Sequence, residues 1–144
     1  MKKQGITVTF SEQAKQITSN GLPGWVNEKI DSLRNNPDQA EAMRFVEAMA
    51  TNPGGALISN GPNSDGINDV YYKETGLPVT PASKQRFESI SKLILAEGTA
   101  IYQTELAKGS SAADIFDKLQ KNMATQPDDY LKVTNWFRAT FATG

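Results

Sequence analysis

Apolar residues recur every three or four positions along most of the chain, which is the spacing of an amphipathic helix. The stripes predict helices that begin near residues 12, 23, 37, 81, 111 and 127. Residue types that favour a helix N-terminus stand at these starts, among them Ser11, Pro23, Pro37 and Ser111. The pattern therefore predicts an all-α fold, a compact bundle of five to six helices.

The longest predicted helix runs from Pro81 to about Lys108. Thr80 is its expected N-cap, and Gly109 is expected to end it. Gly98 lies within this helix, and its missing side chain predicts that another backbone comes close there. The apolar stripe of the helix consists of Phe87, Ile90, Ile94 and Ile101.

Two segments depart from the helical spacing. Ile6, Val8 and Phe10 alternate with threonines, which predicts a short N-terminal strand or an extended arm. Residues 52–80 are rich in glycine, asparagine and proline, and a connection of this length is uncommon in a compact domain unless it is functional or disordered. We therefore expect residues 1–144 to form a single helical domain with a flap inserted at 52–80.

Within the flap, the β-prone runs at 56–58 and 70–72 predict a possible small two-stranded β element. Asn60-Gly61 and Asp65-Gly66 are turn-forming pairs between the two runs. On this reading, residues 59–69 form an unstructured tip that is free to contact a partner.

Composition excludes several classes of chemistry. The 144 residues include no histidine and no cysteine, so Ser-His catalysis, Cys-His catalysis, thiol nucleophiles and disulfides are ruled out. No cofactor is expected, because no glycine-rich phosphate motif follows a predicted strand. The formal net charge is −1 with no block of like charge, so neither a nucleic-acid surface nor an anionic membrane surface is predicted.

Membrane insertion is not expected either, because no stretch of about 18 apolar residues is present. The first residues, MKKQGITVTF, have an apolar run broken by threonines, unlike a secretory signal peptide. The sequence does not decide between a cytoplasmic protein and one secreted without a recognisable signal peptide. The oligomeric state is also left open.

The flap and nearby aromatic residues are the candidate contact surface for a protein partner. Tyr71 and Tyr72 are adjacent, so in a strand their rings point to opposite faces and one ring points outward. Trp136 lies next to Phe137, and on a helix the two side chains diverge by about 100°. The polar candidates of the flap are Asn60, Asn63, Asp65 and Asn68.

A calcium loop is one alternative use of these flap residues. Asn63 and Asp65 fit the helix–loop–helix calcium pattern when Gly66 is placed at its glycine. Gly61 and Tyr72 then occupy the first and last ligand positions, where the pattern requires oxygen ligands and a bidentate glutamate. No metal site is therefore predicted, and turn formation explains the same residues.

A carboxylate-dependent hydrolase acting on glycans is the alternative function. Glu97 falls within the period of the long helix's stripe, where burial would raise the pKa of its carboxyl and suit a general acid. Glu47 precedes the flap, and Asp65 or Asp69 would supply the second carboxylate at about 5–9 Å. Ion pairing or solvation explains these residues better than catalysis does. The sequence therefore favours a non-enzymatic protein–protein interaction module that presents the flap and its flanking aromatics.

Overall fold

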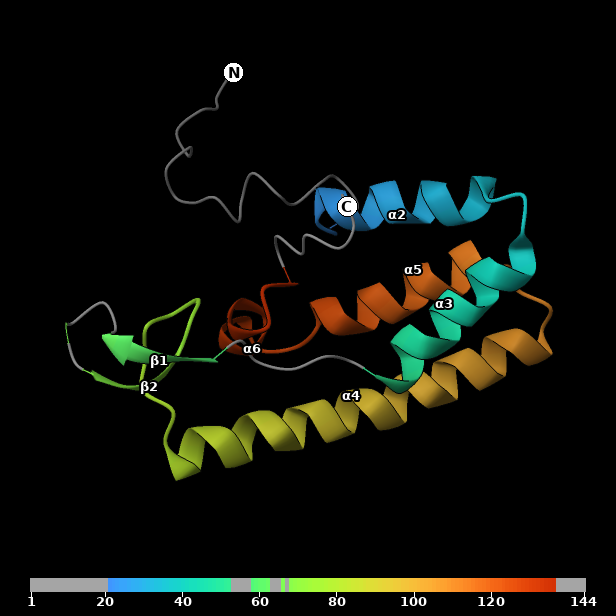
Figure 1. The fold of residues 1–144 in the computed structure, drawn as a ribbon. Coiled ribbons are helices and arrows are strands. Elements are labelled where there is room, and N and C mark those ends of the chain that lie inside the picture. Colours follow the sequence, from blue (N-terminus) through green and yellow to red (C-terminus); the bar gives the residue numbers. More distant parts are fainter. Residues whose placement is uncertain (1–20, 53–57, 63–65, 67, 137–144) are drawn as a thin grey trace, which may run out of the picture.

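The computed structural model describes residues 21–52, 58–62, 66 and 68–136 (Figure 1). This part of the chain is mostly helical, with five helices and a small two-stranded antiparallel sheet. The predicted N-terminal strand and the helix expected near residue 12 lie outside the described residues. In chain order the elements are α2 (Gly24–Asn35), α3 (Gln39–Thr51), β1 (Ile58–Pro62), β2 (Asn68–Tyr72), α4 (Pro81–Ala107), α5 (Ala112–Ala124) and α6 (Asp128–Val133).

Capping side chains define the starts of three helices. Thr80 accepts a hydrogen bond from the Ser83 backbone N–H at 3.0 Å, and Pro81 is the first residue of α4, as predicted. Ser111 accepts from the Asp114 N–H in the same way at the start of α5. Asp38 caps α3 by accepting from the Glu41 N–H at 3.1 Å, so the helix begins two residues after Pro37.

The last helix is shorter than its apolar stripe predicted. α6 ends at Val133, and Asn135 adopts a φ of 59°. Asparagine tolerates this left-handed conformation better than other residues with a side chain, and such a residue commonly ends a helix. The apolar residues Tyr130, Val133, Phe137 and Phe141 predicted a longer helix, but α6 ends before Phe137, and Phe137 and Phe141 lie outside the described residues.

The core is centred on α5, which lies between α2 and α4 and also packs against α3 (Figure 1). Phe116 is fully buried there and meets the ring of Trp25 from α2 edge-on at 6.3 Å between centroids. Phe45 of α3 approaches the same ring at 5.9 Å. One α5 side chain thus joins three helices, and aromatic pairs of this geometry are worth about 0.5–1.5 kcal/mol beyond their burial.

Two buried hydrogen bonds connect the segment after α6 to this core. The Trp25 indole N–H donates to the Trp136 carbonyl at 2.6 Å, and the Trp136 indole N–H donates to Gln120 Oε1 at 2.9 Å. Both tryptophans are therefore buried with their polar atoms satisfied.

The two strands pair in antiparallel register, with Ile58 opposite Tyr72 and Asn60 opposite Val70. Asn60-Gly61 is thus part of a strand, and the expectation that this pair forms a turn is wrong. Gly61 has a φ of 119°, which its missing side chain permits within the pairing. The predicted unstructured tip shrinks accordingly, because residues 59–62 and 68–69 are paired. None of the described helices is long and apolar enough to cross a membrane.

The close approach expected at Gly98 is confirmed. A Cβ at this position would lie 2.9 Å from the Ala50 carbonyl oxygen of α3. We expect Gly98→Ala to destabilise the protein by about 1–3 kcal/mol, because a backbone clash outweighs the gain of about 1 kcal/mol in helix propensity. Urea unfolding measures this, with Ala100→Gly on the exposed side of α4 as the control for propensity. A Gly98→Ala variant as stable as the native chain would show that the helices move apart freely.

Acid should weaken the turn between α4 and α5 through Glu105. This carboxylate is 6% exposed and accepts hydrogen bonds from Ser110 Oγ at 2.8 Å and Lys108 Nζ at 3.1 Å. The Ser110 bond, followed by the Lys108 bond, lowers the Glu105 pKa. A lowered folded-state pKa contributes stability above the ordinary value of 4.5, and that contribution is lost as the pH falls through the folded pKa.

Glu105→Gln should therefore be less stable than the native chain at neutral pH, and the difference should shrink below about pH 4.5. Urea unfolding across a pH series measures both free energies. Glu88→Gln, on an exposed residue of the same helix, controls for the loss of one charge. A difference that stays constant down to pH 2 would contradict the assignment.

Candidate functional site

A concave feature lies between one face of the sheet, the first turns of α4 and the buried tyrosine of α6. We name it the sheet–helix groove. It has a volume of about 570 Å³, within the range of about 300–1,000 Å³ typical of ligand pockets. Its lining is Ile58, Val70, Tyr72, Val79, Lys84, Phe87, Glu88, Ser91, Lys92 and Tyr130.

Sequence periodicity explains how each wall forms. Side chains alternate between the two faces of a strand, so the paired residues Ile58 and Tyr72 share one face with Val70. The α4 wall contains positions 84, 87, 88, 91 and 92, which follow the three- and four-residue steps of a single helix face. A strand face, with every second residue, thus lies opposite a helix face, with residues three or four positions apart.

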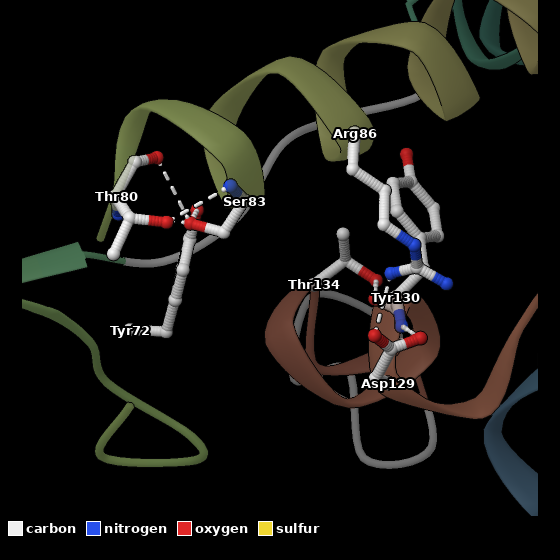
Figure 2. A network of polar contacts seen from close by, with 7 residues as sticks. All are labelled: Tyr72, Thr80, Ser83, Arg86, Asp129, Tyr130 and Thr134. Carbon is white, nitrogen blue, oxygen red and sulfur yellow. Dashed lines mark hydrogen bonds and ion pairs between the residues drawn. The ribbon is translucent and has the colours of Figure 1, made fainter. Parts of the chain in front are cut away.

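A hydrogen-bonded junction holds the sheet against the start of α4 (Figure 2). Ser83 Oγ accepts from the Thr80 backbone N–H at 2.9 Å and donates to the Thr80 carbonyl at 3.1 Å. Because the single hydroxyl hydrogen of Ser83 is then in use, Tyr72 Oη is the donor in its 2.9 Å contact with Ser83 Oγ. The Tyr72 ring also meets Phe87 edge-on at 5.2 Å. The end of β2 is therefore fixed to the capping box of α4.

A second set of polar contacts holds α6 against α4. Arg86 donates to Asp129 Oδ2, and Asp129 Oδ1 accepts from the Tyr130 backbone N–H at 3.0 Å (Figure 2). At the groove itself, Ser91 Oγ and Tyr130 Oη are hydrogen-bonded at 2.8 Å. Tyr130 is only 1% exposed, so it forms a rigid base to the groove.

The charged residues of the groove come from α4 alone. Lys84 and Lys92 are exposed and form no ion pair with any described residue. Glu88 lies one helical turn from each lysine and is the only carboxylate in the described lining. The lining therefore carries one net positive charge beside a mostly apolar surface.

The structure separates the predicted contact residues into exposed and buried sets. Tyr72 is 4% exposed and Trp136 is 5% exposed, so neither ring is available on the surface as an anchor. The burial of Trp136 corrects the expectation of an exposed tryptophan, because its indole N–H has an internal partner. Tyr72 is the inward ring of the tyrosine pair, where it is hydrogen-bonded to Ser83 and contributes to the groove lining. Tyr71 is half-buried on the sheet face opposite Tyr72, and Asn60 is exposed.

The remaining polar candidates of the flap are Asn63, Asp65 and Asn68. Asn68 pairs with Pro62 through the β2 register, and only its backbone is described. Asn63 and Asp65 lie outside the described residues. No cluster of three or more potential metal-binding side chains occurs in the described part of the chain.

The carboxylates considered for hydrolysis do not meet in the groove. Glu97 is half-buried and accepts a hydrogen bond from Asn122 Nδ2 at 3.2 Å. Glu47 is exposed on α3, which packs near Gly98, whereas the sheet lies beside the other end of α4 (Figure 1). Asp69 is exposed on β2 and accepts from the Val70 backbone N–H at 2.7 Å. Asp65 lies outside the described residues.

The sequence analysis did not identify the polar residues of α4 that line the groove. Lys84, Ser91 and Lys92 carry no motif, and they read as the polar flank of an amphipathic helix. One signal was available, because Ile58 and Val70 are apolar residues on a strand face whose other members include Tyr72. Such a face needs an apolar surface opposite, and the start of the next helix is the nearest candidate in sequence.

We expect Tyr72→Phe to destabilise the protein by about 0.5–1.5 kcal/mol, the usual contribution of one hydrogen bond. Ser83→Ala should be at least as harmful, because it also removes the capping box. Urea unfolding of both single variants and the double variant gives the coupling between the two hydroxyls. Strictly additive losses would show that the 2.9 Å contact holds nothing in place.

Comparison with known proteins does not narrow the chemistry of this site. No family model, curated protein sequence or solved structure matches the chain.

Proposed function

We propose that this chain is a non-enzymatic protein-interaction module whose contact site is the sheet–helix groove. The observation that carries the proposal is an open, mostly apolar concavity whose walls expose large aliphatic side chains. Ile58 is 58% exposed and Val70 is 38% exposed, although both line the groove. Exposed apolar surface next to a concavity is typical of binding sites, because a partner removes it from water.

The distribution of carboxylates favours binding over glycan hydrolysis. Hydrolysis by two carboxylates requires a pair about 5–9.5 Å apart across the substrate. Glu88 is the only carboxylate among the described residues that line the groove. Glu97 lies on another part of α4 and is hydrogen-bonded to Asn122 of α5, and Glu47 is exposed on α3. These positions support a role for the carboxylates in solvation and local structure.

The proposal is tested by placing a charge in the groove. Val70→Glu puts a carboxylate on the apolar wall, where a bound partner would have to desolvate it. We expect capture of partner proteins from an extract of the source cells to fall at least about tenfold, as measured by quantitative mass spectrometry.

Leu93→Glu is the matched control, because Leu93 is 53% exposed on α4 and does not line the groove. It introduces the same charge and should leave capture unchanged. Thermal unfolding of both variants verifies that the fold is retained. Equal capture by the native chain and Val70→Glu, or release of reducing sugar from glycans by the native chain, would overturn the proposal.

A further inference from the structure

The hydrogen bonds of β2 determine which residues of β1 direct their backbone groups to the outer edge of the sheet. The Val79 N–H donates to the Val70 carbonyl at 3.0 Å, and the Tyr72 N–H donates to the Leu77 carbonyl at 2.8 Å. Val70 and Tyr72 thus direct their backbone groups away from β1, toward residues 77–79. Successive residues of a strand point their backbone groups to opposite edges, so those of Asp69 and Tyr71 point toward β1.

The strand register then shows which residues of β1 point their backbone groups toward β2. Ser59 is opposite Tyr71 and Gly61 is opposite Asp69, so these two residues face β2. Ile58, Asn60 and Pro62 then direct their backbone groups to the outer edge. No described residue hydrogen-bonds the outward N–H and C=O groups of Ile58 and Asn60. Both residues are exposed, so an extended segment can reach the edge from solvent.

Pro62 limits this edge without weakening the sheet. Proline has no backbone N–H. Because Pro62 is at an outward position, the missing N–H removes no hydrogen bond to β2. The edge therefore offers donors only at Ile58 and Asn60. Short edges that end in proline resist open-ended strand pairing, and they still accommodate a short added strand.

Ile58 belongs to both the edge and the groove. Its side chain lines the groove, and its backbone forms the start of the outer edge, to which no described residue is hydrogen-bonded. A strand added beside β1 would place every second side chain on the same face as Ile58, next to the apolar wall formed with Val70. Lys84 and Lys92, which have no described ion-pair partner, lie on the opposite wall and favour acidic residues in the added segment.

We propose that the partner's contact segment is an extended peptide that adds to the free edge of β1, with aliphatic side chains at alternate positions and acidic residues flanking them. The peptide supplies backbone hydrogen bonds to Ile58 and Asn60, its aliphatic face covers the exposed wall of the groove, and its acidic residues pair with the lysines. This inference rests on the proposed function and specifies the chemistry of the partner at the same site.

The probe is a synthetic peptide, EVTVTVE, titrated into the full chain and followed by amide NMR and hydrogen exchange. The amides of Ile58 and Asn60 should gain at least about tenfold protection on binding. The amides of Ser59 and Gly61 should be protected already in the free protein, because they face β2. Binding without new protection at Ile58 and Asn60 would overturn strand addition.

Backbone methylation of the peptide tests the alternation without altering the protein. N-methylation of the valines and N-methylation of the threonines block opposite edges of the added strand. One of these two peptides should bind at least about tenfold more weakly than the unmodified peptide, and the other should retain its affinity. Equal affinity for both would overturn the proposal.

Charge and edge variants complete the test. The peptide KVTVTVK should bind more weakly than EVTVTVE, and Lys84→Glu with Lys92→Glu should reverse that order. Asn60→Pro removes an outward N–H and should weaken binding, whereas Asn60→Ala should not. If Asn60→Pro disturbs the sheet, the methylated peptides decide the matter alone.

Two outcomes separate this inference from the proposed function. If Val70→Glu abolishes partner capture while no peptide binds, the groove is a contact site and strand addition is wrong. Sedimentation of the free chain tests for a dimer. A dimer that Asn60→Pro dissociates would assign the edge to a second copy of the chain and would overturn the proposal of a peptide partner. If neither capture nor peptide binding depends on these residues, both proposals fall.

Discussion

The hydroxyl of Tyr72 makes the contact on which the candidate site depends. It joins the end of β2 to Ser83, and Ser83 is itself part of the capping box that starts α4. A two-stranded sheet is marginally stable alone and needs an apolar surface to rest on. By fixing Tyr72 over Phe87, this contact sets the separation between sheet and helix. The space left between them is the groove, with Tyr130 as its base.

Local chemistry was sufficient to predict much of the fold. Thr80 and Ser111 act on backbone groups three positions away, so their roles can be predicted without the tertiary structure. At Gly98 the sequence predicted that another backbone comes close, but only the fold identifies it as that of Ala50 in α3. Asn60-Gly61 shows the limit of this reasoning. The pair has a strong turn propensity, yet pairing with Val70 and Asp69 holds it in a strand, because cross-strand bonds outweigh local preference.

The candidate site was harder to predict because it joins separate parts of the chain. Ile58, Lys92 and Tyr130 meet only after the sheet, α4 and α6 have assembled. Each residue is ordinary within its own element, and no spacing in the sequence relates them. The hydrogen-bond partners of Trp136 could not be predicted for the same reason, since Trp25 lies on α2 and Gln120 lies on α5.

The hydrogen bond between Trp25 and Trp136 spans 111 positions along the chain. During synthesis, the first core helix must therefore wait for almost the whole domain before its tryptophan finds an acceptor. Until then the Trp25 indole N–H lacks the Trp136 carbonyl as its acceptor. This long-range contact favours folding of the described helices as one unit over independent folding of α2.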